Sequence, residues 1–183
     1  NLDIAKILED LLYVNGASNV YLTRDDDSTL TNRDRYTFAN GTNGEVLVSI
    51  HLNAATNDIT DGTLGLYGKR NKDLEFTNVM HNSMWEALKN TPDFIDFGIT
   101  NFASGVLLKS HMPATIQETV YISSNYECSA LTDGTGDRQE EIANALLGGL
   151  ENWFSTSNDN DDEEPEEPST GRPCETPPCG KNK

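Results

Sequence analysis

The stretch VLVSIHLNAA, residues 46–55, is the part of the sequence from which the fold can be worked out. It begins with a run of aliphatic side chains, which is typical of a buried strand. His51 then stands at the exit of this strand and is followed by the polar Asn53 and two alanines. Two interpretations of His51 are open on these residues alone: it binds a metal ion, or it is hydrogen-bonded at a strand end.

Segments with helical and strand patterns alternate on both sides of this stretch. Apolar side chains at helical spacing predict helices over 2–12, about 30–40, 71–89 and from 137 onward. Shorter apolar runs predict strands over about 20–23, 46–53, 62–67 and 115–122, whereas 91–105 has the composition of a loop. This alternation predicts an α/β fold with a mixed, mostly parallel sheet and helices on both faces.

The composition bounds the number of domains and the kinds of partner. The chain has 183 residues with 30 acidic and 13 basic side chains. We expect one domain over residues 1–154 and an acidic, proline-rich, disordered linker or tail over 155–183, which has little apolar surface to bury. The acidity is not confined to the tail, because residues 1–154 carry 22 acidic and ten basic side chains. This balance argues against nucleic acid and anionic membranes as partners, and no apolar run approaches the roughly 20 residues of a membrane span.

The cysteines suggest an extracellular setting. Cys174 and Cys179 stand five residues apart in PCETPPCG, and a small disulfide loop there would suit an oxidising compartment. Zinc binding by this pair is disfavoured because no further Cys or His lies nearby. Cys128 stands alone in the folded part, where we expect a buried or half-buried thiol.

A carboxylate inside a predicted strand is the second chemical clue. In TIQETVY, alternation places Glu118 on the same face as Ile116 and Val120, which is not the pattern of a solvent face. A buried carboxylate is costly unless it is paired or bound to a metal, and burial raises its pKa towards that of a general base. The alternative is an edge strand with Glu118 in water. Sites in α/β sheets collect at the carboxyl ends of strands, where His51 stands, and this favours the metal interpretation.

Three segments in this order resemble the catalytic domain of zinc-dependent N-acetylmuramoyl-L-alanine amidases of the amidase-3 type, which are cell-wall hydrolases. They are VYLTRDDDSTLTNRDRYTFAN (20–40), VLVSIHLNAA (46–55) and MPATIQETVYISSNYE (112–127). The family shows Leu-Thr-Arg at a strand end, an Arg and an Ala-Asn pair on the next helix, Ser-Ile-His-x-Asn, and later Pro, a strand with Glu, an aromatic and Ile-Ser-Asn. The resemblance covers about residues 1–154 and implies a phosphorylase/hydrolase-like sheet.

The resemblance implies roles by position. His51 corresponds to a zinc ligand, and Glu118 corresponds to the catalytic glutamate that activates the water at the zinc ion. Asn53 matches a motif asparagine, for which we expect an orienting role behind the ligand. Arg24 matches a motif arginine that we expect to be structural. His81 and His111 match no ligand position.

The chain also departs from the family pattern. The family has two further zinc ligands, a His in a Gly-rich loop after the first strand and a Glu shortly before the first long helix. This sequence begins on that helix, so we interpret it as N-terminally incomplete, with the first strand and both remaining ligands upstream of Asn1. We then expect a neighbouring strand to be left unpaired and this chain to be inactive alone. Gln117 stands where an apolar residue is usual.

The resulting expectation is an enzyme. The parent protein would use Zn²⁺ to hydrolyse the amide between N-acetylmuramic acid and L-alanine in peptidoglycan during bacterial cell-wall remodelling. We expect it to be secreted, extracellular or cell-wall associated, with a wall-binding or anchoring module beyond the tail. Two alternatives stay open: a zinc-free cell-wall-binding or regulatory module on the same fold, and a zinc peptidase of related architecture.

Overall fold

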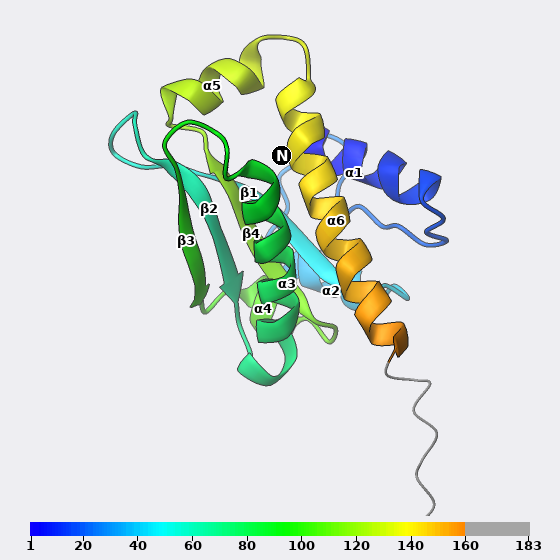
Figure 1. The fold of residues 1–183 in the computed structure, drawn as a ribbon. Helices are drawn as coiled ribbons and strands as arrows, with labels where there is room; N and C mark the ends of the chain where they lie inside the picture. Colours follow the sequence, from blue (N-terminus) through cyan, green and yellow to red (C-terminus); the bar gives the residue numbers. More distant parts are fainter. Residues whose placement is uncertain (160–183) are drawn as a thin grey trace, which may run out of the picture.

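The computed structural model describes residues 1–159, the last three of them by their backbone alone. In chain order its elements are α1 (Leu2–Val14), α2 (Asn32–Asn40), β1 (Leu47–Asn53), β2 (Asp61–Tyr67), α3 (Arg70–Leu88), β3 (Phe94–Asn101), α4 (Gly105–Lys109), β4 (Ala114–Tyr121), α5 (Asn125–Thr132) and α6 (Asp137–Asp159). The strands form one sheet in the order β1–β4–β2–β3 (Figure 1). Two pairs, β1–β4 and β2–β3, are parallel, and the central pair β4–β2 is antiparallel. The predicted mixed, mostly parallel sheet is confirmed.

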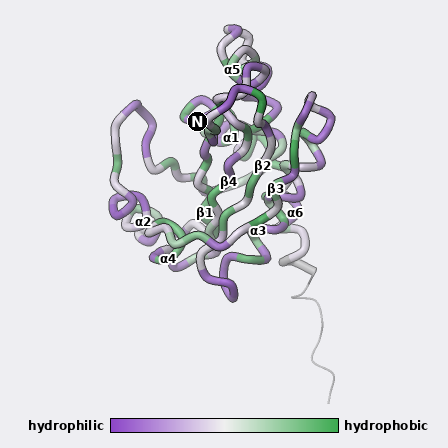
Figure 2. Tube along the Cα trace, turned by 90° about the vertical axis from the view of Figure 1, so that its left-hand side faces the viewer, coloured by the Kyte–Doolittle hydropathy of each residue, from purple (hydrophilic) through white to green (hydrophobic). Residues whose placement is uncertain are grey.

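Helices cover both faces of this sheet, as the alternation of elements predicts. The buried faces of α1, α3 and α6 meet in the main hydrophobic core on one side. On the other side, Leu107 of α4 joins Leu66, Ala114 and Ile116 of the sheet in a smaller apolar cluster. Figure 2 shows α2 and α4 on one side of the strands and α6 on the other.

Apolar spacing explains why these helices pack as they do. The first helix buries Ile4 and Leu8, which lie one turn apart. The long α3 buries apolar residues at the same four-residue spacing, and so does α6; they are Phe76, Met80, Met84, Leu88, Ile142, Leu146 and Leu150. Each fully buried side chain of this size contributes about 1.5–3 kcal/mol, so these helix faces contribute substantially to the stability of the fold.

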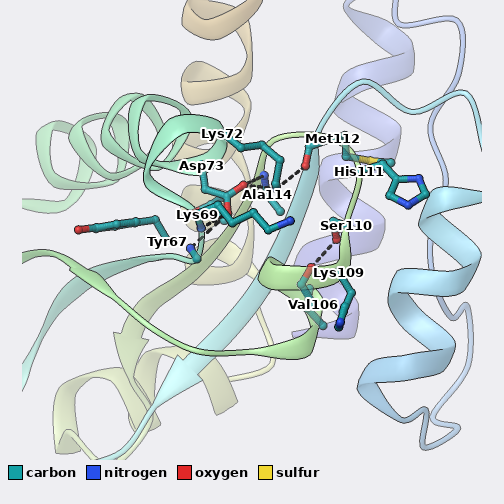
Figure 3. A network of polar contacts seen from close by, with 12 residues as sticks. Tyr67, Lys69, Lys72, Asp73, Val106, Lys109, Ser110, His111, Met112 and Ala114 are labelled. Carbon is teal, nitrogen blue, oxygen red and sulfur yellow. Dashed lines mark hydrogen bonds and ion pairs between the residues drawn. The ribbon is translucent and has the colours of Figure 1, made fainter.

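A buried aspartate joins α3 to the sheet (Figure 3). The Asp73 carboxylate is fully buried and accepts backbone hydrogen bonds from Gly68 at 3.2 Å and Lys69 at 2.8 Å, immediately before the helix. It also accepts the Ala114 N–H bond at 3.0 Å, at the start of β4. The Lys72 ammonium pairs with the same carboxylate and donates to the Met112 carbonyl at 2.6 Å. One side chain therefore fixes the start of α3 against the start of the strand that carries Glu118.

Two segments differ from the sequence expectation. The predicted loop over 91–105 contains β3, which pairs with β2 in parallel, and the helix α4 begins at its end. Its apolar Ile95 and Phe97 are exposed, so the segment lacks the burial pattern of a typical strand. Conversely, a strand was predicted over 20–23, but this segment is not a strand and pairs with none of the strands within residues 1–159. The edge of β1 that faces away from β4 is likewise unpaired within that range.

The last part of the domain is more helical than expected. The sequence did not predict α5, which begins after Ser124, whose hydroxyl accepts the Glu127 N–H bond. Its Cys128 is exposed, contrary to the expected buried or half-buried thiol. The long α6 begins at Asp137 as predicted and continues to Asp159, past the expected boundary at 154. Cys174 and Cys179 lie outside the described residues.

None of the helices within residues 1–159 is both long enough and apolar enough to cross a membrane.

Candidate active site

The sheet brings His51 and Glu118 side by side. They are register partners on the parallel neighbours β1 and β4, so their side chains project from the same face. His51 Nδ1 lies 3.8 Å from Glu118 Oε1, which is close for electrostatics but too long for a hydrogen bond. The imidazole is 49% exposed and the carboxylate 15% exposed. Two residues selected separately from the sequence therefore belong to one site.

The predicted grouping of Glu118 with Ile116 and Val120 is only half right. Ile116 belongs to the smaller apolar cluster, but Val120 packs in the main core on the other side of the sheet. The register explains this difference, because His51 pairs with Glu118 whereas Asn53 pairs with Tyr121, so β4 has one extra residue in this interval. Glu118 is thus the last regularly paired residue of β4 before a bulge.

The surroundings set the protonation of the pair. Burial raises the pKa of Glu118, because an apolar environment disfavours the charged carboxylate. Its register partner on the neighbouring strand β2 is Leu64, whose apolar side chain adds to this environment. Burial also lowers the pKa of His51, and the positive charge of Arg35 lowers that pKa further. His51 is therefore neutral at pH 7, which is the form that binds a metal, and Glu118 is a stronger base than an exposed carboxylate.

A cavity of about 1370 Å³ opens over these two residues. It extends along β1 and is lined also by α1, residues 15–24, α2 and the later part of α6. His51, Glu118 and Arg35 are among its lining residues. The Arg35 guanidinium donates a hydrogen bond to Thr23 Oγ1 at 3.3 Å. Sequence reasoning did not assign Arg35 to the site. It is one of two arginines in TNRDRY, and the helix pattern alone does not show which of them faces His51.

The other candidate residues from the sequence form their hydrogen bonds with groups other than the side chains of His51 and Glu118. The Asn53 side chain accepts the Ala54 N–H bond at 2.8 Å, so it holds the chain where β1 ends. Arg24 donates to the Asp26 carbonyl at 2.7 Å and stabilises its own loop. His81 lies under the sheet with its Nε2 2.7 Å from Asp96 Oδ1, and the exposed His111 bonds Asn40 through its backbone N–H.

The donor set fits zinc only in part. A neutral imidazole beside a carboxylate in a half-buried position is suitable chemistry for a zinc ligand and its base. A catalytic zinc normally has three protein ligands, however, and the described part of the chain contains no group of three or more His, Cys, Asp or Glu side chains that could hold a metal. His51 would therefore be one member of a larger set.

Comparison with known proteins places the chain in a family. The sequence profile of the amidase-3 family, described as N-acetylmuramoyl-L-alanine amidase, matches residues 1–152. The protein YqiI of Bacillus subtilis strain 168, which is uncharacterised, is 25% identical over 154 residues, covering 84% of this chain and 72% of YqiI.

Solved structures of amidases share the fold. The catalytic domain of CwlV, an N-acetylmuramoyl-L-alanine amidase from Bacillus (Paenibacillus) polymyxa var. colistinus, is 30% identical with a TM-score of 0.75, over 84% of this chain and 82% of that domain. An N-acetylmuramoyl-L-alanine amidase of Clostridium difficile 630 is 28% identical with a TM-score of 0.73, over 85% of this chain and 82% of that one. The chain belongs to the amidase-3 family of N-acetylmuramoyl-L-alanine amidases.

Proposed function

We propose that this protein hydrolyses the amide between the lactyl group of N-acetylmuramic acid and the L-alanine of the stem peptide in peptidoglycan. Family membership supports hydrolysis of peptidoglycan amides in general. The observation that carries the assignment of roles is the pair of a neutral His51 and a desolvated Glu118, 3.8 Å apart on the wall of one cavity.

Glu118 is the general base in this proposal. Its carboxylate takes a proton from the attacking water as the oxygen adds to the amide carbon. The same carboxyl group then gives that proton to the departing α-amino group of L-alanine, which cannot leave as an anion. The raised pKa of Glu118 suits both steps, because the group must accept a proton and release it within one cycle.

His51 is a zinc ligand in this proposal. Its low pKa keeps a ring nitrogen unprotonated at neutral pH, as metal binding requires. When bound, zinc supplies Lewis-acid chemistry, which polarises a carbonyl and makes water more acidic. We propose that the remaining ligands lie outside the described residues. Asn53 would support the site indirectly, because its bond to Ala54 fixes the end of β1 two residues after His51.

The bond that is cut distinguishes this function from its alternatives. Incubation of the zinc-supplied full-length protein with purified peptidoglycan should release stem peptides with a free L-alanine amino group and leave N-acetylmuramic acid with a free lactyl carboxyl group. Mass spectrometry of the products, with labelling of new amino groups, detects both ends. Peptides cut between two amino acids would indicate a peptidase instead. Binding of peptidoglycan without any new amino groups would indicate a non-enzymatic wall-binding module.

The expected location follows from the substrate. We propose that the protein acts outside the cytoplasm, at or near the cell wall, since peptidoglycan lies there. A wall-binding or anchoring module beyond residue 183 would keep the catalytic domain close to this polymer.

A further inference from the structure

Two buried threonine hydroxyls bond to the main chain of the candidate active pair. Thr119 follows Glu118 on β4, Thr63 lies on the neighbouring strand β2, and both side chains are fully buried. Thr119 Oγ1 donates a hydrogen bond to the His51 carbonyl at 3.1 Å, and Thr63 Oγ1 donates one to the Glu118 carbonyl at 3.3 Å. Each member of the pair therefore has its main chain bonded to a side chain that is shielded from water.

The bulge of β4 gives the first of these bonds its importance. Between His51 and Asn53, β1 has one residue, whereas β4 has two residues between their register partners Glu118 and Tyr121. A bulge interrupts the ladder of backbone hydrogen bonds and bends the strand that contains it. Thr119 lies in this interval, and its hydroxyl bonds across the sheet to the His51 carbonyl. This bond joins β4 to β1 where the ladder is interrupted.

The strand β2 holds β4 from its other side. The antiparallel register of these two strands ends at the pair Leu64 and Glu118. Thr63 is the next residue of β2 beyond this pair, and its bond to the Glu118 carbonyl extends the contact between the strands. After the bulge, Oδ1 of the buried Asp61 accepts the Tyr121 N–H bond at 3.1 Å. The bulge is therefore held by β2 on both sides of its extra residue.

The alternative is that these bonds only satisfy buried hydroxyls, because threonine is common in strands and a buried polar group needs a partner. The other two fully buried threonines argue that burial alone does not impose such bonds. The Thr115 hydroxyl, also on β4, lies 3.5 Å from its carbonyl acceptors, and Thr77 Oγ1 on α3 has no partner within residues 1–159. The two shorter bonds are those whose acceptors belong to His51 and Glu118.

We propose that Thr119 and Thr63 are positioning residues, which fix the main chain of His51 and Glu118 so that the imidazole and the carboxylate face the same point in the cavity. This inference rests on the proposed function, in which Glu118 is the general base and His51 is a zinc ligand. Precise placement matters for such groups, because a misplacement of about 1 Å lowers a rate by up to about 100-fold. Since the two threonines act on different members of the pair, their loss should have different effects.

The test compares Thr63→Val and Thr119→Val in the zinc-supplied full-length protein. Valine replaces the hydroxyl by a methyl group of similar size. We expect Thr63→Val to lower kcat for soluble peptidoglycan fragments by about 10- to 100-fold, with KM changed by less than about twofold and zinc affinity kept. We expect Thr119→Val to weaken zinc affinity by about 10- to 100-fold, which is the usual effect of losing a group that supports a metal ligand.

Two controls separate positioning from a loss of packing. Thr77→Val removes an equally buried hydroxyl that has no acceptor among the described residues, and it should keep both kcat and zinc affinity. Thr119→Ser and Thr63→Ser keep the hydroxyl and should retain most of what the valine variants lose. Thermal unfolding of each variant establishes that it is folded at the assay temperature. Valine variants that match Thr77→Val in kcat and zinc affinity, or serine variants as impaired as the valine ones, would overturn the inference.

The same assay distinguishes failure of this inference from failure of the proposed function. An inactive Glu118→Gln together with fully active valine variants that bind zinc normally would overturn only the positioning role. Retention of most activity by Glu118→Gln would overturn the proposed function, and the positioning role with it.

A measurement on the wild-type protein does not depend on folded variants. The hydroxyl protons of Thr119 and Thr63 should exchange slowly with water and give separate proton NMR signals, because both groups are buried and bonded. Exchange as fast as that of the exposed Thr29 hydroxyl would show that the bonds do not form, and the inference would then be wrong.

Discussion

Replacing Glu118 with Gln should reduce the hydrolysis of peptidoglycan by about 10²- to 10⁴-fold, which is the usual contribution of a general base. The amide of glutamine has nearly the same shape but cannot take a proton from water. The fold should not suffer, because Glu118 is desolvated and its carboxylate lies 3.8 Å from the His51 ring, beyond hydrogen-bonding distance. Removing a charge from such a position costs no pairing energy.

The measurement is the initial rate of release of new amino groups from peptidoglycan by the zinc-supplied full-length protein, together with its thermal unfolding. Glu45→Gln is the matched control, because Glu45 lines the same cavity just before β1 and is exposed. This control should keep nearly full activity. Retention of most activity by Glu118→Gln would show that another group is the base.

The Asp73→Ala substitution should lower the free energy of unfolding by about 3–5 kcal/mol, the range for breaking a buried, charged hydrogen-bond network. Three backbone N–H groups, those of Gly68, Lys69 and Ala114, would lose their acceptor. The Lys72 ammonium would keep only its bond to the Met112 carbonyl. The start of α3 and the start of β4 would then no longer be held together.

Denaturant unfolding monitored by circular dichroism measures this loss. Glu75→Ala, two residues further along the exposed side of α3, is the matched control and should change the stability by no more than about 0.5 kcal/mol. A loss of less than about 1 kcal/mol for Asp73→Ala would mean that water accepts the three backbone N–H bonds in place of the carboxylate.

The candidate site was predictable because its two members obey local rules. His51 follows an aliphatic run at a strand exit, and Glu118 is a carboxylate in an otherwise apolar strand. The resemblance of the flanking segments to the amidases then assigned roles to both. Their pairing across β1 and β4 came from the parallel register, which a single sequence does not contain.

Other features depended on contacts that local patterns do not reveal. Val120 was placed on the wrong face because the alternation rule assumes an uninterrupted register, and the bulge breaks it. The β3 segment was missed because Ile95 and Phe97 are exposed and Gly98 interrupts the run. The buried roles of Asp61 and Asp73 depend on N–H donors from the distant β4, namely Tyr121 and Ala114.

The most direct test of the central claim, that His51 and Glu118 form a zinc-dependent hydrolytic centre, is the zinc content of the full-length protein after dialysis against micromolar zinc. We predict nearly one zinc per protein for the wild type and for Glu118→Gln, since the base is not a ligand. We predict loss of most of that zinc for His51→Ala, with His111→Ala as the control that keeps it. Near-stoichiometric zinc in His51→Ala would contradict the account, because the metal would then be held elsewhere.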